Sequence, residues 1–480
     1  MTMETDSVGY AGIARRLRPG AESAIPRQKV IVLGAGLAGL AAAYELTRED
    51  CDVVIFEARK RPGGRVYTLR EPFDDGLYAE AGATRIPDSH RLTMHYADVF
   101  GLPLEPLPSK QTQVVHLRGH RILIAEGKPV HWPLDLTSEE RGLGLAGIKR
   151  KYLGRALDEI GDSTAPGWSA EPFEAYDRLT FAEFARAQGA SFGAVELLNL
   201  GMERLPHSFS ALLGLREISL DMHTRQWFMI PGGNDRLPKA IAMHLGDRIR
   251  YGTAVTRIEQ GPEGVRILAG SQWISGDRII CSIPLSALKR VEISPPLPQA
   301  KRLAFEAIAY ASIVRFYSQS KRRFWMDEGI TGLEMAATDL SISRVWNVTA
   351  NQPGKKGILL SYMLGAQARN VAAMPESDQC GAVLEQMERI HPGIRENCER
   401  TASKNWDADQ WARGGFALLG PGQMTSLVPQ IARPEGRLHF AGEHTSLWGA
   451  WMQGALESGR RAAQEVRAAL GETPRPLMTV

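Results

Sequence analysis

The chain has 480 residues, of which 44% are hydrophobic and 23% are charged, as in an ordinary globular protein. A formal net charge of +3 gives no electrostatic case for binding nucleic acid or an anionic membrane. No apolar run approaches the roughly twenty residues of a membrane-spanning helix. The four cysteines form no close pair, so no metal site is expected. Because the N-terminus lacks the apolar stretch of a secretory signal, we expect a soluble, cytoplasmic protein.

The first predicted elements form a βαβ unit. Residues 29–33 and 52–56 are β-branched runs typical of buried parallel strands, and an Ala- and Leu-rich helix over 37–48 lies between them. The turn from Gly34 to Gly39 fits G-x-G-x-x-G, whose glycines permit a tight turn, a close approach to a pyrophosphate and close helix–strand packing. Glu57 ends the second strand, where an acid accepts hydrogen bonds from ribose hydroxyls. These features predict a dinucleotide at the helix N-terminus.

The following segments alternate between helical and strand patterns. Residues 134–220 show apolar residues at helical spacing and predict a mainly helical insertion. Strand patterns return at 248–258, 264–268, 277–282, 312–317 and 357–362. The final segment, 437–470, predicts a strand, a loop and a long helix from about Met452. Strand patterns on both sides of a helical block imply domains built from non-contiguous segments.

The ten residues from Glu57 to Val66 distinguish the dinucleotide. Gly63, Gly64 and Arg65 bring further backbone N–H groups and a guanidinium to the same pyrophosphate. Here the sequence resembles the flavin amine oxidase family, which includes monoamine, polyamine and L-amino acid oxidases. The resemblance runs from about residue 30 to residue 470, and further blocks that support it are 81–87, 232–238, 312–325, 406–422 and 440–459.

The resemblance implies FAD and the residues that bind it. Glu443 is similar to the acid that holds the ribityl or pyrophosphate part, Met452 to a residue whose N–H meets the pyrimidine end of the flavin, and Val255 to one whose backbone holds the adenine. The implied cofactor-binding residues are Gly34, Ala35, Gly36, Leu37, Ala38, Gly39, Glu57, Ala58, Arg59, Gly64, Arg65, Gly82, Ala83, Thr84, Arg85, Val255, Trp406, Gly442, Glu443, Ala450, Trp451 and Met452.

The segment from Gly414 to Ala417 bears on how FAD is attached and on the substrate. Monoamine oxidases carry here a cysteine that bonds covalently to the flavin. Phe416 replaces that cysteine, so we expect non-covalent FAD. Ala417 replaces one wall of the aromatic cage that binds amines, and Trp451 supplies the other wall. A half-present cage argues against a simple monoamine substrate.

Arg85 is the candidate that indicates the substrate. In L-amino acid oxidases the similar arginine makes a bidentate contact with the substrate carboxylate, since its planar donors match a carboxylate. The resemblance also places the Tyr362 hydroxyl on that carboxylate, the Ala450 backbone toward the amino group, and Trp451 in the pocket. Arg315 is the candidate catalytic residue, because it replaces a family lysine that holds water near flavin N5. It either positions water and favours negative charge on reduced flavin and superoxide, or points elsewhere.

Four further polar residues are candidates for a functional role. His131 and His223 are expected to be structural, because no base or metal spacing accompanies them. Glu217 and Asp221 either face a cationic substrate side chain or occupy solvated positions.

The expected fold is α/β, with a Rossmann-like FAD-binding domain, a mixed-sheet substrate-binding domain and a helical insertion. The predicted ranges are 27–68, 236–302 and 430–470 for FAD binding; 69–125, 225–235 and 303–429 for substrate binding; 126–224 for the helical domain; 1–26 for an N-terminal extension; and 471–480 for a C-terminal tail.

The expected function is that of an FAD-dependent L-amino acid oxidase. Its partners would be an L-amino acid and oxygen, with hydride transfer to flavin N5 and reoxidation by oxygen giving a 2-oxo acid, ammonia and hydrogen peroxide. The alternatives are an L-amino acid 2-monooxygenase that forms an amide, an amine or polyamine oxidase, and a non-catalytic FAD-binding interaction module. A homodimer is the default expectation, since cyclic dimers are the commonest assemblies.

Overall fold

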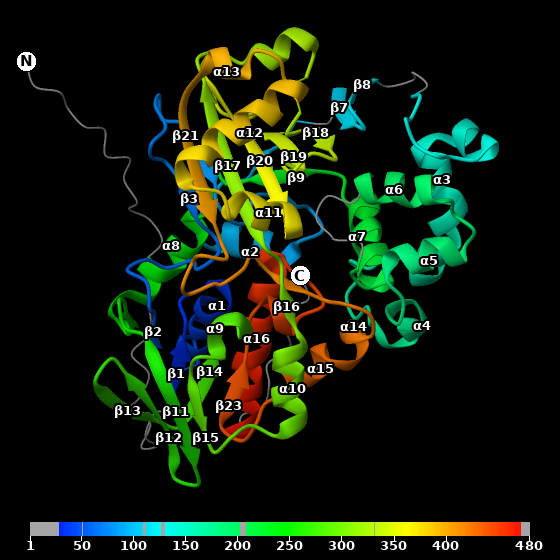
Figure 1. Cartoon of the computed structure of the whole chain (residues 1–480). Coiled ribbons are helices and arrows are strands. Elements are labelled where there is room, and N and C mark those ends of the chain that lie inside the picture. Colours follow the sequence, from blue (N-terminus) through cyan, green and yellow to red (C-terminus); the bar gives the residue numbers. More distant parts are fainter. Residues whose placement is uncertain are drawn as a thin grey trace, which may run out of the picture.

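The structure is a computed structural model that describes residues 28–49, 51–108, 112–125, 130–201, 208–330 and 332–471. The predicted N-terminal extension, and the predicted C-terminal tail beyond residue 471, lie outside these residues. The described chain forms a parallel sheet, a large mixed sheet and a block of helices (Figure 1). The expected α/β fold is confirmed, whereas the exact domain boundaries stay a prediction.

The parallel sheet has the strand order β10 (Ile249–Arg250), β2 (Asp52–Phe56), β1 (Lys29–Leu33), β14 (Arg278–Cys281) and β23 (Leu438–Phe440). β1 and β2 match their predicted ranges. Val30 and Val32 face a core with helices α1 (Leu37–Thr47) and α16 (Met452–Ala469). Ile31 and Leu33 face the opposite core, which includes residues of β11 (Val255–Gly261) and β12 (Gly264–Ala269). Burial on both faces explains why these strands are continuously apolar.

One predicted strand was wrong in its extent. The pattern at 248–258 predicted a single strand, but the chain forms β10 and β11 with a turn between them. Gly252 has a φ of +67°, which extended strands do not adopt, and its N–H donates to the carbonyl of Arg59. The turn moves the chain from the parallel sheet to the four-stranded sheet beside it, whose order is β13 (Gln272–Gly276), β12, β11 and β15 (Glu292–Ser294).

The mixed sheet has seven strands in the order β21 (Cys398–Asn405), β17 (Ile313–Ser320), β20 (Gly357–Leu364), β19 (Arg344–Asn347), β18 (Glu334–Thr338), β7 (Thr112–Leu117) and β8 (His120–Ala125). Helices α11 (Gly365–Ala372) and α12 (Glu376–Ile390) cover one face, against Val314 and Leu359. Arg315 lies opposite Tyr362 in the β17–β20 register. Because side chains alternate along a strand, this pair lies on the other face.

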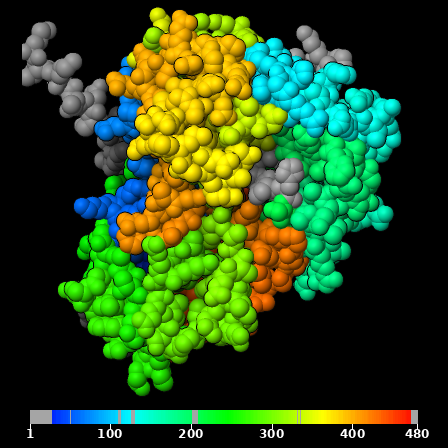
Figure 2. All heavy atoms as spheres, in the orientation of Figure 1, coloured from blue at the N-terminus to red at the C-terminus, as the bar shows by residue number. Residues whose placement is uncertain are grey.

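The segment predicted as a helical insertion, residues 134–220, forms helices in the structure. It contains α3 (Ser138–Ile160), α4 (Glu174–Asp177), α5 (Phe181–Ala187), α6 (Phe192–Gly201) and α7 (Ala211–His223). Thr137 and Glu140 form a capping box at the start of α3, and the Ser210 hydroxyl caps α7. The block forms a lobe along one side of the molecule (Figure 2). Over the described part of the chain, no helix is long and apolar enough to cross a membrane.

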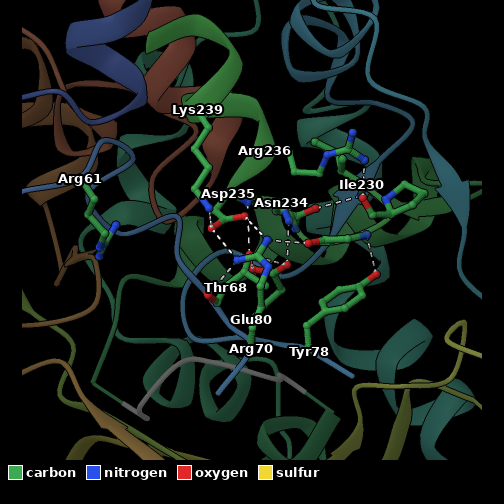
Figure 3. Close-up of polar contacts among 12 residues, drawn as sticks. Arg61, Thr68, Arg70, Tyr78, Glu80, Ile230, Asn234, Asp235, Arg236 and Lys239 are labelled. Carbon is green, nitrogen blue, oxygen red and sulfur yellow. Dashed lines mark hydrogen bonds and ion pairs between the residues drawn. The ribbon is translucent and has the colours of Figure 1, made fainter. Parts of the chain in front are cut away.

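The buried carboxyl group of Glu80, in β4 (Ala79–Glu80), is hydrogen-bonded to β3 (Thr68–Leu69) and to the segment before α8 (Arg236–Leu245), as Figure 3 shows. The Thr68 hydroxyl donates to Glu80 at 2.9 Å, and the Asn234 N–H donates to Glu80 at 2.7 Å. Asp235 next to it accepts a bidentate pair of hydrogen bonds from Arg70. Burial raises the pKa of Glu80 to about 8, so the folded chain favours its neutral form.

We predict that Glu80 makes the chain less stable as the pH rises from about 4.5 to about 8. Over that range the folded chain retains a proton that the unfolded chain releases, so the free energy of unfolding falls by up to about 1.4 kcal/mol per pH unit. The variant Glu80→Gln, which resembles the protonated acid, should flatten this slope. Thermal unfolding from pH 5 to 8.5 measures it, with the exposed Glu263→Gln as control. An unchanged slope in Glu80→Gln would contradict the assignment.

Candidate functional site

A cavity of about 400 Å³ lies between the parallel sheet and the inner face of the mixed sheet. It brings together residues from the N-terminal, central and C-terminal parts of the chain. Of the predicted site residues, Ala35 and Gly39 are absent from its lining. Those that line it are Gly34, Gly36, Leu37, Ala38, Glu57, Ala58, Arg59, Gly64, Arg65, Gly82, Ala83, Thr84, Arg85, Val255, Arg315, Tyr362, Trp406, Gly442, Glu443, Ala450, Trp451 and Met452.

The glycine turn lies where β1 leads into α1. Gly34 has a φ of +99°, which favours glycine. A Cβ on Gly39 would lie 2.0 Å from the carbonyl oxygen of Gly34, so only glycine fits this packing. Gly36 differs, because a Cβ there would meet no protein atom within 4 Å. Gly36 is the N-cap of α1 and makes no side-chain cap, so the first N–H groups of the helix are available to an anion in the cavity.

Glu57 follows β2 and is bonded to the glycine turn. Its two carboxylate oxygens accept the N–H groups of Ala35 and Arg59, each at 2.7 Å. Burial raises its pKa, and these two hydrogen bonds oppose that effect. A carboxylate has about four acceptor positions, so Glu57 retains capacity for ribose hydroxyls. This geometry suits the predicted role and adds a second one, because Glu57 also fixes the turn.

Glu443 and Arg65 form a buried ion pair at the cavity. Arg65 Nη1 donates to Glu443 Oε1 at 2.8 Å and to the carbonyl of Gly415 at 2.9 Å. The other contacts of Glu443 are the N–H groups of Ala417, at 3.2 Å, and Ala450, at 2.9 Å. Burial is the largest single effect and raises the pKa of Glu443, but the charge of Arg65 and the hydrogen bonds from Arg65 and Ala450 together lower it below its ordinary value. Glu443 thus fixes the cavity wall through three chain segments.

Arg59 has a partner that the sequence did not suggest. Its guanidinium makes two hydrogen bonds to Asp409, at 3.0 and 2.6 Å, and Lys404 also donates to Asp409 at 2.8 Å. Although Asp409 is largely buried, these two cations lower its pKa well below the ordinary range. Arg59 therefore lines the cavity in a fixed position, with its charge partly neutralised.

The Arg85 guanidinium lies over two indole rings. Its Cζ is 4.4 Å from the ring centroid of Trp227 and 5.0 Å from that of Trp346. The short strand β5 (Ile86–Pro87) pairs with β9 (Trp227–Met229), and this pairing places Arg85 beside Trp227. The sequence did not identify either tryptophan, because neither lies in a block that supported the resemblance. Two indoles close to the guanidinium favour its positive charge through cation–π contacts.

Tyr362 and Arg315 form the adjoining wall of the cavity. The Arg315 Cζ lies 4.6 Å from the Tyr362 ring centroid, and the Tyr362 and Trp346 centroids are 5.4 Å apart. Arg315 Nη1 donates to the Glu80 carbonyl at 2.7 Å and to the Thr84 hydroxyl at 3.0 Å. Arg315 thus lines the cavity, as one of its predicted alternatives requires, but its position is set by β4 and the segment after it.

Trp451 and Ala450 close the cavity from the C-terminal side, just before α16. The Trp451 ring stacks on Trp227, with centroids 6.1 Å apart and an interplanar angle of 29°. Ala450 has a φ of +66°, an uncommon conformation for a residue other than glycine. Phe416, at the position of the family cysteine, lines the cavity, whereas the neighbouring Ala417 does not.

The four remaining candidates lie outside the lining of the cavity. His131 and His223 are exposed, and His223 contacts the carbonyl of Ser219. Asp221 is exposed, whereas the half-buried Glu217 accepts a hydrogen bond from Trp451. Within the described residues, no group of three or more His, Cys, Asp or Glu side chains could hold a metal ion.

The cavity fits a flavin dinucleotide. The uncapped N-terminus of α1 and the open space at Gly36 suit a pyrophosphate, and Glu57 suits a ribose. The apolar and aromatic lining near Phe416 and Trp406 suits a flat ring system. Arg85 and Tyr362, the predicted substrate-binding residues, line this same cavity, so one space could hold both cofactor and substrate.

Comparison with known proteins gives consistent matches over nearly the whole chain. A family model described as flavin containing amine oxidoreductase matches residues 37–467. An L-amino-acid oxidase of Demansia vestigiata is 28% identical over 456 residues, covering 92% of this chain and 87% of that protein. A Bacillus subtilis (strain 168) protein named "Putative L-amino-acid oxidase YobN" is 32% identical over 468 residues, covering 94% and 97%.

Solved structures of amine oxidases share the fold. Putrescine oxidase bound to putrescine superposes with a TM-score of 0.78 at 22% identity, covering 92% of this chain and 99% of that one. Cyclohexylamine oxidase from Brevibacterium oxydans IH-35A also gives a TM-score of 0.78 at 22% identity, covering 93% and 100%. At this identity the likeness shows the fold alone.

Replacement of Gly36 and replacement of Gly39, two glycines of the turn, should affect different properties of the protein. Gly36→Ala should leave the apoprotein stable and weaken FAD binding about tenfold or more, because the added methyl group occupies only the space of the pyrophosphate. Gly39→Ala should lower the unfolding temperature of the apoprotein itself, because its Cβ meets the Gly34 carbonyl. Titration with FAD and thermal unfolding of the apoproteins measure these effects. Equal FAD affinity in Gly36→Ala and wild type would contradict the pyrophosphate position.

Proposed function

Because this chain belongs to the family of flavin-containing amine oxidoreductases, with FAD as its cofactor, we propose that it is an L-amino acid oxidase. An L-amino acid, oxygen and water would be converted to a 2-oxo acid, ammonia and hydrogen peroxide. FAD, when bound, supplies the electron chemistry by accepting two electrons and passing them to oxygen. The observation that carries the proposal is the position of Arg85 within the cavity that the cofactor residues line.

Arg85 is suited to a substrate carboxylate by its geometry. The residue is 6% exposed, and its guanidinium lies over the rings of Trp227 and Trp346. A guanidinium held in this way is restricted in rotation and offers its planar N–H edge. Two parallel N–H groups match the two oxygens of a carboxylate, and such charge-assisted pairs are stronger than neutral hydrogen bonds. A simple amine has no group for this edge.

The neighbouring residues complete the proposed substrate site. Tyr362 lines the cavity beside Trp346, and its hydroxyl would donate to the same carboxylate. The N–H of Ala450 is bonded to Glu443, so the carbonyl is the backbone group that Ala450 offers to the substrate amino group. Arg315 would contribute a positive charge to the cavity wall, favouring negative charge that develops during oxidation.

Replacement of Arg85 tests the carboxylate contact. Arg85→Lys should lower kcat/KM for L-amino acids by about 100-fold, because a lysine keeps the charge but loses the bidentate geometry. The visible absorbance of bound FAD is measured in parallel, because Arg85 is also among the implied cofactor-binding residues, and kcat/KM is expressed per bound FAD. The matched control is Arg91→Lys, at an exposed arginine that begins helix α2 (Arg91–Val99). Wild-type kcat/KM in Arg85→Lys would refute the contact.

The class of reaction is tested by the substrates and products of the holoprotein. Anaerobic mixing with each of the twenty L-amino acids should bleach the flavin absorbance for at least one of them. In air, that substrate should give 2-oxo acid and hydrogen peroxide in equal amounts. An amide with carbon dioxide would indicate a 2-monooxygenase. Bleaching only by putrescine or cyclohexylamine would indicate an amine oxidase, and no bleaching by any of these compounds would favour a non-catalytic module.

A further inference from the structure

A short loop joins the cofactor residues to the substrate residues. Residues 448–451, called here the tryptophan loop, comprise Trp448, Gly449, Ala450 and Trp451 and lead into α16. Ala450 and Trp451 line the cavity. The loop adopts an uncommon backbone conformation at Ala450, so its shape must be stabilised by contacts around it.

Two consecutive residues of helix α7 contact the two tryptophans of this loop. Glu217 Oε1 accepts a hydrogen bond from Trp451 Nε1 at 3.2 Å. The Cζ of Arg216 lies 4.4 Å from the Trp448 ring centroid. Arg216 is 1% exposed, and burial lowers its pKa to about 10, so it remains a cation at neutral pH. Adjacent side chains on a helix diverge by about 100°, which lets one turn of α7 reach both rings.

His90 contacts the same two rings. Its ring centroid lies 5.2 Å from that of Trp448 and 4.8 Å from that of Trp451. The interplanar angles are 86° and 84°, so the contacts are edge-to-face. Contacts from α7 and from the segment before α2 therefore restrict the two indoles together. A change in either contact would be expressed as a change in ring orientation.

The orientation of Trp451 is transmitted to Arg85 by stacking. Trp451 stacks on Trp227, and Trp227 lies against the Arg85 guanidinium at 4.4 Å. The hydrogen bond from Trp451 to Glu217 therefore restrains one end of a row of flat groups, and Arg85 lies further along the same row. Glu217 does not line the cavity itself.

We propose that Glu217 is a positioning residue that sets substrate specificity through this row. It fixes the rotation of Trp451, and thereby the width of the pocket and the direction of the Arg85 edge. The helical block would then select the substrate side chain, although its α7 residues Arg216 and Glu217 lie outside the cavity lining. The kinetic consequence rests on the proposed function, whereas the orientation of the indoles does not.

Three variants of α7 test the proposal in the holoprotein. Glu217→Ala removes the acceptor and should lower kcat/KM about tenfold, mainly through KM, and change the order of preference among small and large L-amino acids. Glu217→Gln keeps an acceptor oxygen and should stay within about threefold of wild type. Asp221→Asn, at an exposed acid of the same helix, should behave as wild type. Near-ultraviolet circular dichroism should change only in Glu217→Ala, because it reports the packing of tryptophans.

A fourth variant covers the case in which Glu217→Ala does not fold. Trp451→Phe keeps a ring at the cavity wall but removes the N–H donor, so it should reproduce the altered order of preference. Unchanged preference in Trp451→Phe would overturn the proposal when Glu217→Ala does not fold, and unchanged preference in both variants would overturn it when both fold.

The Glu217 variants also test whether the Glu217 carboxylate contacts the substrate directly. If Glu217→Gln is as impaired as Glu217→Ala, and only with cationic amino acids, the positioning role is overturned. If no L-amino acid reduces the wild-type flavin, the proposed function fails, and the dichroism comparison alone decides the role of Glu217. An unchanged spectrum in Glu217→Ala would then overturn it.

Discussion

The buried carboxylate of Glu443 is the contact on which the rest of the site depends. It accepts hydrogen bonds from Arg65 and from the N–H groups of Ala417 and Ala450, which belong to three separate segments. One segment follows the glycine turn, one carries Phe416 and one leads into α16. Removing one partner of such a buried pair leaves an uncompensated charge, which typically costs 3–5 kcal/mol. Cofactor and substrate residues are therefore held in register by one acid, and neither set is arranged independently of the other.

Local patterns predicted the elements around the glycine turn well, because these elements are close in sequence. The strand, turn and helix around Gly34 need only hydrophobic periodicity and glycine spacing, and their bounds agree with the structure within a residue. The rest of the site depends on contacts between distant segments. Asp409 lies 350 residues from Arg59, and no local signal marks it as a partner. Trp227 likewise contacts Arg85 only because β9 pairs with β5, a register that periodicity does not reveal.

The fold of this chain does not determine its substrate. The chain shares its fold with amine oxidases at 22% identity. The fold positions a flavin against the inner face of the mixed sheet but does not decide which groups face it. Arg85, whose guanidinium lies over two indole rings, is a cation on the wall of the cavity and would favour an anionic group there. The proposed amino acid substrate therefore depends on one side chain and its neighbours, and not on the architecture.

Stacked rings connect Arg85 to helix α7, outside the cavity lining. A hydrogen bond constrains two atoms, whereas a row of flat groups in contact transmits a rotation from one ring to the next, because each would otherwise lose contact area. The row from Trp451 through Trp227 to Arg85 begins at α7 and ends in the substrate pocket. The glycine turn and Glu57 lie outside this row. Under the proposed function, substitutions in the helical block would alter the substrate side chain that is accepted and leave the dinucleotide-binding turn as it is.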